Sequence, residues 1–181
     1  MWAVELNAPS MNSDIGEIVS EEHDVSFLGE WLAKENRIFA FLDACGEPLI
    51  PPKVQELGSR SISLYRGSTQ SEHAFLAPFA VEVDDELIAW IQQALAGTPW
   101  GYFMLTDKNC SLLEIRKHFR RFLTVKLPNR TQVLFRFYDP RVIPTFLESA
   151  EKQDLSAFFG PVDSFGLIIP ESGKVNVIHR V

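Results

Sequence analysis

The segment Val133–Val142, VLFRFYDPRV, brings charged side chains into the most aromatic part of the chain. Arg136, Asp139 and Arg141 lie within six residues of sequence. Two arginines beside an aspartate could bind an anion or take part in catalysis. The same residues could equally serve the fold, because a charge-assisted hydrogen bond between arginine and aspartate can fix a corner of the chain.

The side-chain directions in this segment depend on its secondary structure. If residues 133–138 form a strand, alternate side chains point to opposite faces, so Arg136 and Tyr138 lie on the face away from the phenylalanines. A buried arginine there needs a carboxylate or a carbonyl oxygen as its partner. Asp139, Asp43 and main-chain carbonyl groups are the candidates. We interpret Arg136 and Asp139 as a structural lock at a strand-to-helix corner.

A second concentration of charge lies in the segment 112–123, LLEIRKHFRRFL. At 100° per residue one face is apolar, and Lys117, Arg120 and Arg121 share the other, with Arg116 at the border. The apolar face consists of Leu112, Ile115, Phe119, Phe122 and Leu123. This basic face could bind an anionic partner or nucleic acid. It could also be the solvated side of an ordinary core helix, whose dipole favours cations near its C-terminus.

The sequence contains none of the short motifs that identify common enzyme classes. There is no GxSxG nucleophile elbow, no Walker loop and no GxGxxG fingerprint. No HExxH or CxxC spacing occurs, and Cys45 and Cys110 are too far apart to suggest a metal site. His118, in the basic segment, is interpreted as a packed hydrogen-bonding residue. We therefore predict a protein that is not an enzyme and that holds no metal and no cofactor.

Charge is distributed unevenly along the chain, whose net charge is −7. Residues 111–141 contain eight lysines and arginines against two acidic residues, a balance of +6, so the remainder carries −13. A basic face on an acidic body can steer an acidic partner, although the two surfaces could also pair within one molecule. A nucleic-acid or nucleotide-binding module using the face 116–141 is the alternative, but an isoelectric point of about 5.1 disfavours nucleic acid.

Hydrophobic periodicity predicts an α/β fold: one domain with a mixed β-sheet flanked by helices and a C-terminal β-hairpin. A capping box at Ser111 and Glu114 predicts one helix start, and Asp139 as N-cap before Pro140 predicts another. Three prolines predict a loop over 46–53. Helices are expected at 27–32, 85–95 and 112–123, strands at 37–43, 61–66, 77–83, 100–106, 125–127 and 131–138, and the final hairpin around 171–174.

The N-terminal part of the chain is polar, acidic and aperiodic. We interpret residues 1–24 as a flexible leader before a single domain at 25–181. The leader has no basic n-region and no continuous apolar stretch, so it does not resemble a signal peptide. No apolar run in the chain reaches the roughly 18 residues needed to span a bilayer. We therefore predict a cytoplasmic protein without membrane insertion.

Several segments together resemble a known bacterial family. RIFAFLDA, LYRG, WGYFMLTD, LLEIRKHFRRFLTVKLPN, VLFRFYDPRV and FFGPV follow one another as in the type VI secretion effector-chaperone, or adaptor, family, also described as domain of unknown function 4123. The most specific part is HFRR followed at this interval by FRFYDPR. The resemblance covers about residues 36–162, so the leader and the C-terminal end lie outside it.

Membership of that family would imply a dedicated loading factor. Such proteins bind a toxic effector in the cytoplasm of the producing cell and help to attach it to the spike protein of the contractile apparatus. The resemblance thus implies a non-enzymatic adaptor whose partners are a secreted effector and the spike protein. The residues that the resemblance suggests for contact are Arg120, Arg121, Arg136, Tyr138, Asp139 and Arg141. We assign Arg136 and Asp139 to the structural lock and the other four to partner contact.

Overall fold

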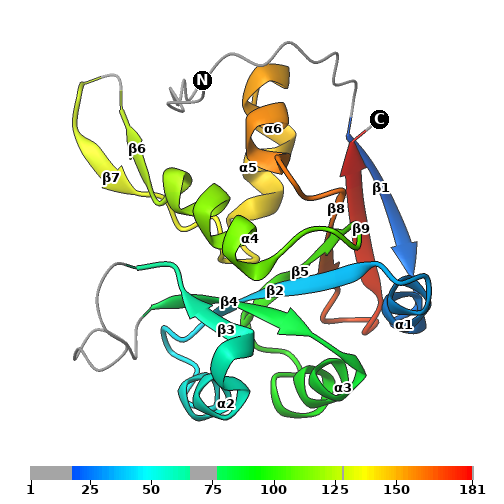
Figure 1. Ribbon diagram of the computed structural model, residues 1–181. Helices are drawn as coiled ribbons and strands as arrows, with labels where there is room; N and C mark the ends of the chain where they lie inside the picture. The colour runs from blue at the N-terminus through cyan, green and yellow to red at the C-terminus, as the bar shows by residue number, and fades with distance from the viewer. Residues whose placement is uncertain (1–17, 66–76, 128, 181) are drawn as a thin grey trace.

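Seven strands form one sheet through the middle of the protein in the computed structural model, which describes residues 18–65, 77–127 and 129–180 (Figure 1). The strand order is β1-β9-β8-β5-β2-β4-β3, so strands from opposite ends of the chain pair at one edge. The strands are β1 Ile18–His23, β2 Arg37–Asp43, β3 Ser61–Ser63, β4 Pro78–Val83, β5 Gly101–Thr106, β8 Ser164–Ile168 and β9 Val175–Arg180.

Helices cover both faces of this sheet (Figure 1). In β2, Ile38 and Leu42 pack into the core on one face, and Phe39 and Phe41 pack into the core on the other. In the described part of the chain, no helix is long and apolar enough to cross a membrane. The first face is covered by α1 Ser26–Ala33, α2 Ile50–Leu57 and α3 Asp85–Ala94, and the second by α4 Leu112–Phe119, α5 Ile143–Ser149 and α6 Lys152–Phe159.

The predicted α/β class, the flanking helices and the C-terminal hairpin of β8 and β9 are confirmed. The direction of the strands needs a correction, because every pairing described for this sheet is antiparallel rather than mixed. α2 and α3 each connect strands that run in the same direction, but those strands are not neighbours. β4 lies between β2 and β3, and β2 lies between β4 and β5. The two strands that each of these helices connects are therefore separated by one antiparallel strand.

Residues 18–23 form β1, although their sequence places them in a flexible leader. β1 pairs along its whole length with β9, from Ile18 opposite Arg180 to His23 opposite Val175. Most of its side chains are exposed, so it lacks the apolar alternation by which a strand is usually found. Its position depends on main-chain pairing with a strand that is distant in sequence. Residues 1–17, the rest of the predicted leader, lie outside the described residues.

The proline-rich segment predicted as a loop over 46–53 contains the start of α2. Pro51 and Pro52 stand in the first turn of that helix, where main-chain N–H groups have no partner within the helix. The missing N–H groups of the prolines therefore cost the helix no hydrogen bond. The loop prediction is wrong from Ile50 onward. The same reasoning explains why Pro144 is accommodated in the first turn of α5, which starts at Ile143, instead of breaking the helix.

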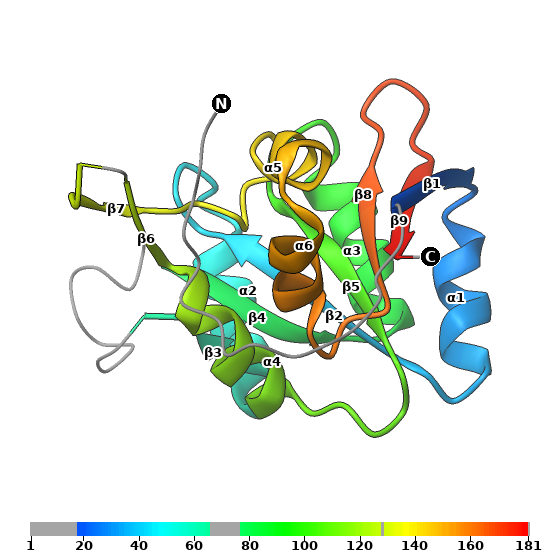
Figure 2. The same ribbon diagram turned by 90° about the horizontal axis from the view of Figure 1, so that it is seen from above.

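Local signals at other helix starts are confirmed. The Ser111 hydroxyl accepts a hydrogen bond from the Glu114 N–H at 3.2 Å, and the Glu114 carboxylate accepts the Ser111 N–H at 2.7 Å. Asp84 caps α3 by accepting the Leu87 N–H. The two remaining strands, β6 Thr124–Lys126 and β7 Gln132–Leu134, form the predicted hairpin, which projects from the body of the domain (Figure 2).

Candidate functional site

The charged residues of the FRFYDPR motif form an ion-pair cluster with Asp43 at the end of β2. The Arg136 Nη2 atom lies 2.6 Å from Asp43 Oδ2 and 3.8 Å from Asp139 Oδ2. Arg141 donates two side-chain hydrogen bonds to Asp139, from Nε at 2.9 Å and from Nη2 at 2.7 Å. The structure therefore brings the predicted lock residues, Arg136 and Asp139, near one another, but the closer partner of Arg136 is Asp43.

Electrostatics in this ion-pair cluster favour the charged forms. Burial would raise the pKa of Asp139, but hydrogen bonds from the Arg141 side chain and N–H outweigh it and hold the pKa below its usual value. Burial would likewise lower the pKa of Arg136, and the bond to Asp43 raises it instead. Two arginines facing two aspartates leave the cluster without net charge. Such an arrangement gives an anionic ligand little attraction and favours a structural role.

The predicted strand over 131–138 ends early, because β7 stops at Leu134. Phe137 and Tyr138 follow in a turn, and both of their side chains are buried, at 0% and 2% exposure. Adjacent strand residues would face opposite ways, so the expected alternation fails here. The Tyr138 hydroxyl lies 3.2 Å from the Tyr65 hydroxyl. The prediction that Tyr138 contacts a partner therefore needs a correction, because its ring has no accessible surface to offer.

Asp139 shapes the turn that leads into α5. Its carboxylate accepts the Arg141 N–H at 2.9 Å, and its carbonyl oxygen accepts the N–H groups of Val142 and Ile143. The prediction that Asp139 is the N-cap of the next helix is wrong, because that position belongs to Val142. An Asp-Pro pair suits a turn as well as a cap, since the aspartate can bond its own main chain two residues later.

The predicted basic face is present on α4 and on the 3-10 helix Arg120–Phe122 that continues it. Ile115 and Phe119 are buried toward the sheet, as the helical pattern predicts. On the opposite side lies a recess of about 760 Å³, which we call the α4 recess. Four cations line it: Arg116, Lys117, Arg120 and Arg121.

Hydrogen bonds hold two of these cations in place without using carboxylates. Arg116 Nε donates to the Ser63 carbonyl oxygen at 2.9 Å, which ties α4 to β3. Arg121 Nη2 lies 2.7 Å from His118 Nδ1, and its Nε donates to the His118 carbonyl oxygen. Since these acceptors carry no negative charge, the positive charges of Arg116 and Arg121 remain available to an anionic partner.

His118 is a packed hydrogen-bonding residue between α4 and α6. Its Nε2 lies 2.8 Å from the Phe158 carbonyl oxygen, and its Nδ1 receives Arg121. These contacts fit the neutral ring with its proton on Nε2. Burial lowers the pKa of His118 to about 4; the Phe158 carbonyl opposes this shift and Arg121 adds to it. Close packing continues at Gly160, where an added Cβ would lie 2.0 Å from His118 Cε1.

The lowered pKa of His118 predicts a loss of stability in mild acid. The unfolded ring binds a proton at pH values near 6.5, but the folded ring does so only near pH 4. The contribution of His118 to the free energy of unfolding is therefore fully present above pH 6.5 and is lost as the pH falls through about 4. The total loss is up to about 3 kcal/mol. Urea unfolding of the wild type and of His118→Gln across this window measures it. If the free energy of unfolding changed with pH equally in both proteins, the prediction would be contradicted.

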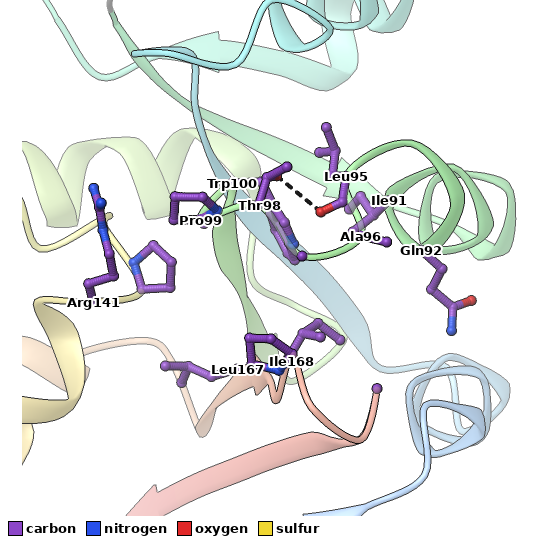
Figure 3. Close-up of a pocket in the computed structure, with 15 residues that line it drawn as sticks. Ile91, Gln92, Leu95, Ala96, Thr98, Pro99, Trp100, Arg141, Leu167 and Ile168 are labelled. Atoms are coloured by element: carbon purple, nitrogen blue, oxygen red, sulfur yellow. Dashed lines mark hydrogen bonds between the residues drawn. The ribbon is translucent and has the colours of Figure 1, made fainter.

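Arg141 lies at a different recess from the other predicted contact residues (Figure 3). An apolar crevice of about 540 Å³ lies among the C-terminal end of α3, the start of β5 and the β8–β9 hairpin, and Arg141 and Pro140 are part of its lining. Trp100 and Leu167 also line it. The residues predicted to bind a partner thus do not form one site, because Arg120 and Arg121 line the α4 recess instead.

Sequence reasoning singled out the cations of the α4 recess and missed its other lining residues, Leu113 and Tyr65 among them. Leu113 could have been found, because it precedes Lys117 by four residues and Arg120 by seven, a spacing that places all three on one helix face. Its side chain is 63% exposed, which is unusual for a leucine beside a core helix face. No sequence signal indicates Tyr65, since it reaches the recess from the end of β3.

These features define an α/β domain with a self-neutralised ion-pair cluster and a cationic recess. Within the ranges that the structure describes, no three His, Cys, Asp or Glu side chains gather as a metal site would require. The chain belongs to the family described as Domain of unknown function (DUF4123), whose model matches residues 38–157, about two thirds of the chain. The match lies within the resemblance at 36–162. Comparisons with curated proteins and with solved structures found no match.

Proposed function

We propose that this chain is a non-enzymatic chaperone or adaptor of type VI secretion. In this role it binds a toxic effector in the cytoplasm and helps to load it onto the spike protein. Membership of the DUF4123 family and the succession of motifs around HFRR and FRFYDPR support the proposal. The partner is a protein, because the accessible charges lie on an open surface and not around an enclosed reaction centre.

The observation that carries this proposal is the composition of the α4 recess. Cations on α4 stand beside Leu113, whose side chain is 63% exposed. Protein interfaces combine apolar anchors with arginine, and a leucine that gains a partner leaves water on binding. The conspicuous FRFYDPR motif supports the same conclusion from the opposite side. Its charges are paired with one another and its tyrosine is buried, so it serves the fold that presents α4.

Co-expression with the effector encoded beside this chain tests the function. We expect the soluble fraction of the effector to rise and the two proteins to purify together, with the spike protein retained from the native cell. Arg120→Ala combined with Arg121→Ala should weaken retention roughly thirtyfold or more, since interface arginines each contribute about 1 kcal/mol or more.

The matched control for this pull-down is Lys152→Ala combined with Lys174→Ala, which removes the same charge from exposed positions outside the α4 recess. Circular dichroism establishes that each variant is folded. The proposed function is wrong if the folded wild type retains neither effector nor spike protein.

A further inference from the structure

We infer that the α4 recess binds a short acidic segment of its partner that carries one large apolar side chain. The identity of the partner rests on the proposed function, but the chemistry of the segment follows from the recess itself. The recess is an open hollow of about 760 Å³, so it accepts a few residues and not a domain surface.

The charge of the recess selects an acidic segment. Arg116, Lys117, Arg120 and Arg121 all contribute to its lining, whereas none of the described residues that line it is an aspartate or a glutamate. The acceptors that hold Arg116 and Arg121 are carbonyl and imidazole groups. A carboxylate that enters can therefore form charge-assisted hydrogen bonds with Arg116 and Arg121 without displacing either from a described carboxylate.

The apolar part of the recess selects one large hydrophobic side chain in that segment. Leu64, Leu113 and Leu123 line it together with Tyr65. Leu113 is largely exposed, while Leu64 is fully buried at the base of the sheet and Leu123 is half-buried. An apolar side chain placed among them removes exposed leucine surface from water, which the cations alone would not do.

The recess is also held ready for binding. Arg121 is fixed by two contacts to His118, and the neutral ring of His118 is fixed in turn by the Phe158 carbonyl oxygen. Arg116 is anchored on Ser63. Side chains that are already ordered lose less conformational freedom when a ligand binds, so even a short segment can gain useful affinity.

A polypeptide fits this recess better than a nucleic acid. The four cations of the recess belong to α4 and the 3-10 helix after it, and the net charge of the chain is −7. A nucleic acid carries a phosphate about every 3.4 Å along each strand and would extend beyond these cations over a protein of net negative charge. A short acidic segment can place its charges on the cations and end there.

Fluorescence anisotropy of the full chain with the labelled peptide Asp-Glu-Leu-Glu-Asp tests the inference. We expect saturable binding that weakens as NaCl rises from about 50 to about 300 mM. Leu113→Ser should weaken binding roughly five- to tenfold. Lys117→Glu combined with Arg121→Glu should weaken it at least roughly tenfold at low salt. A peptide with serine in place of leucine should bind the wild type less tightly than the leucine peptide does. Leu113→Ser should bind the two peptides with equal affinity.

Two matched controls separate the recess from general effects. Leu49→Ser alters another exposed leucine, and Lys152→Glu combined with Lys174→Glu makes the same change in net charge elsewhere. Both should bind the peptide like the wild type, and urea midpoints should show that all variants are folded. Equal binding by recess variants and controls overturns the inference, as does a single-stranded oligonucleotide that binds the recess more tightly than the peptide.

Failure of this inference can be distinguished from failure of the proposed function. If the chain retains its effector and the recess variants retain it equally well, the inference is wrong and the adaptor function stands. If the peptide binds as expected but no effector or spike protein is retained, the recess chemistry stands and the adaptor function is wrong.

Discussion

Replacing Gly101 with alanine is expected to destabilise the domain by about 2 to 5 kcal/mol. Gly101 begins β5 with a φ of 138°, and a Cβ there would lie 1.8 Å from the Phe41 carbonyl oxygen and 2.8 Å from its carbonyl carbon. β2 and β5 are central strands with both faces packed, so neither can move aside. The expected cost combines overpacking of about 1 to 3 kcal/mol with positive-φ strain of about 1 to 2 kcal/mol.

Urea unfolding followed by circular dichroism measures this effect. Gly46→Ala is the matched control, because Gly46 also has a positive φ, of 90°, but nothing lies within 4 Å of its added Cβ. The control should lose only the strain contribution. Equal losses for the two variants would show that the Phe41 main chain moves easily, and the rigid packing that we describe for β2 and β5 would be wrong.

Replacing Arg136 and Asp139 together with alanine is expected to cost about 3 to 5 kcal/mol and to unfold much of the protein. Most of this cost comes from Asp43, whose side chain is 3% exposed and would lose the cation 2.6 Å from its Oδ2. Asp139 contributes less, because its partner Arg141 is 66% exposed and can be solvated by water. The free energy of unfolding and effector retention should both be measured on this variant.

Arg60→Ala provides the control for this double substitution. Arg60 pairs with Asp84, but both side chains are more than 40% exposed, so we expect a loss of about 1 kcal/mol or less. Loss of folding in the double variant supports the structural lock. Intact folding with lost effector binding would contradict it and would assign Arg136 and Asp139 to the partner site.

Much of the fold could be predicted because its signals are local. Ser111 and Glu114 satisfy each other's main-chain groups within one turn, so their spacing alone predicts the start of α4. The apolar run at 37–43 predicts a buried strand, and β2 has those bounds. β1 could not be predicted in this way. Its side chains are mostly exposed, and its partner β9 lies more than 150 residues away in sequence.

In the candidate site too, the features set by neighbouring residues could be predicted, and those set by tertiary packing could not. The helical pattern of 112–123 predicts a basic face, and Arg120 and Arg121 do line the α4 recess. Tyr138 was predicted on the strand face away from the phenylalanines, but the chain turns after Leu134 and buries it. The turn depends on how the segment packs against the sheet, which the alternation of residues within the segment does not reveal.

The sequence by itself determined most of the elements, the caps of α3 and α4, the basic helix and the family. The tertiary structure alone decided which aspartate binds Arg136, that the sheet is antiparallel, and that Leu113 and Tyr65 meet the cations of α4 in one recess. The physical reason is the range of the interactions. Helix caps and hydrophobic periodicity act over a few residues, whereas ion pairs, strand pairing and recesses join side chains that only the folded chain brings together.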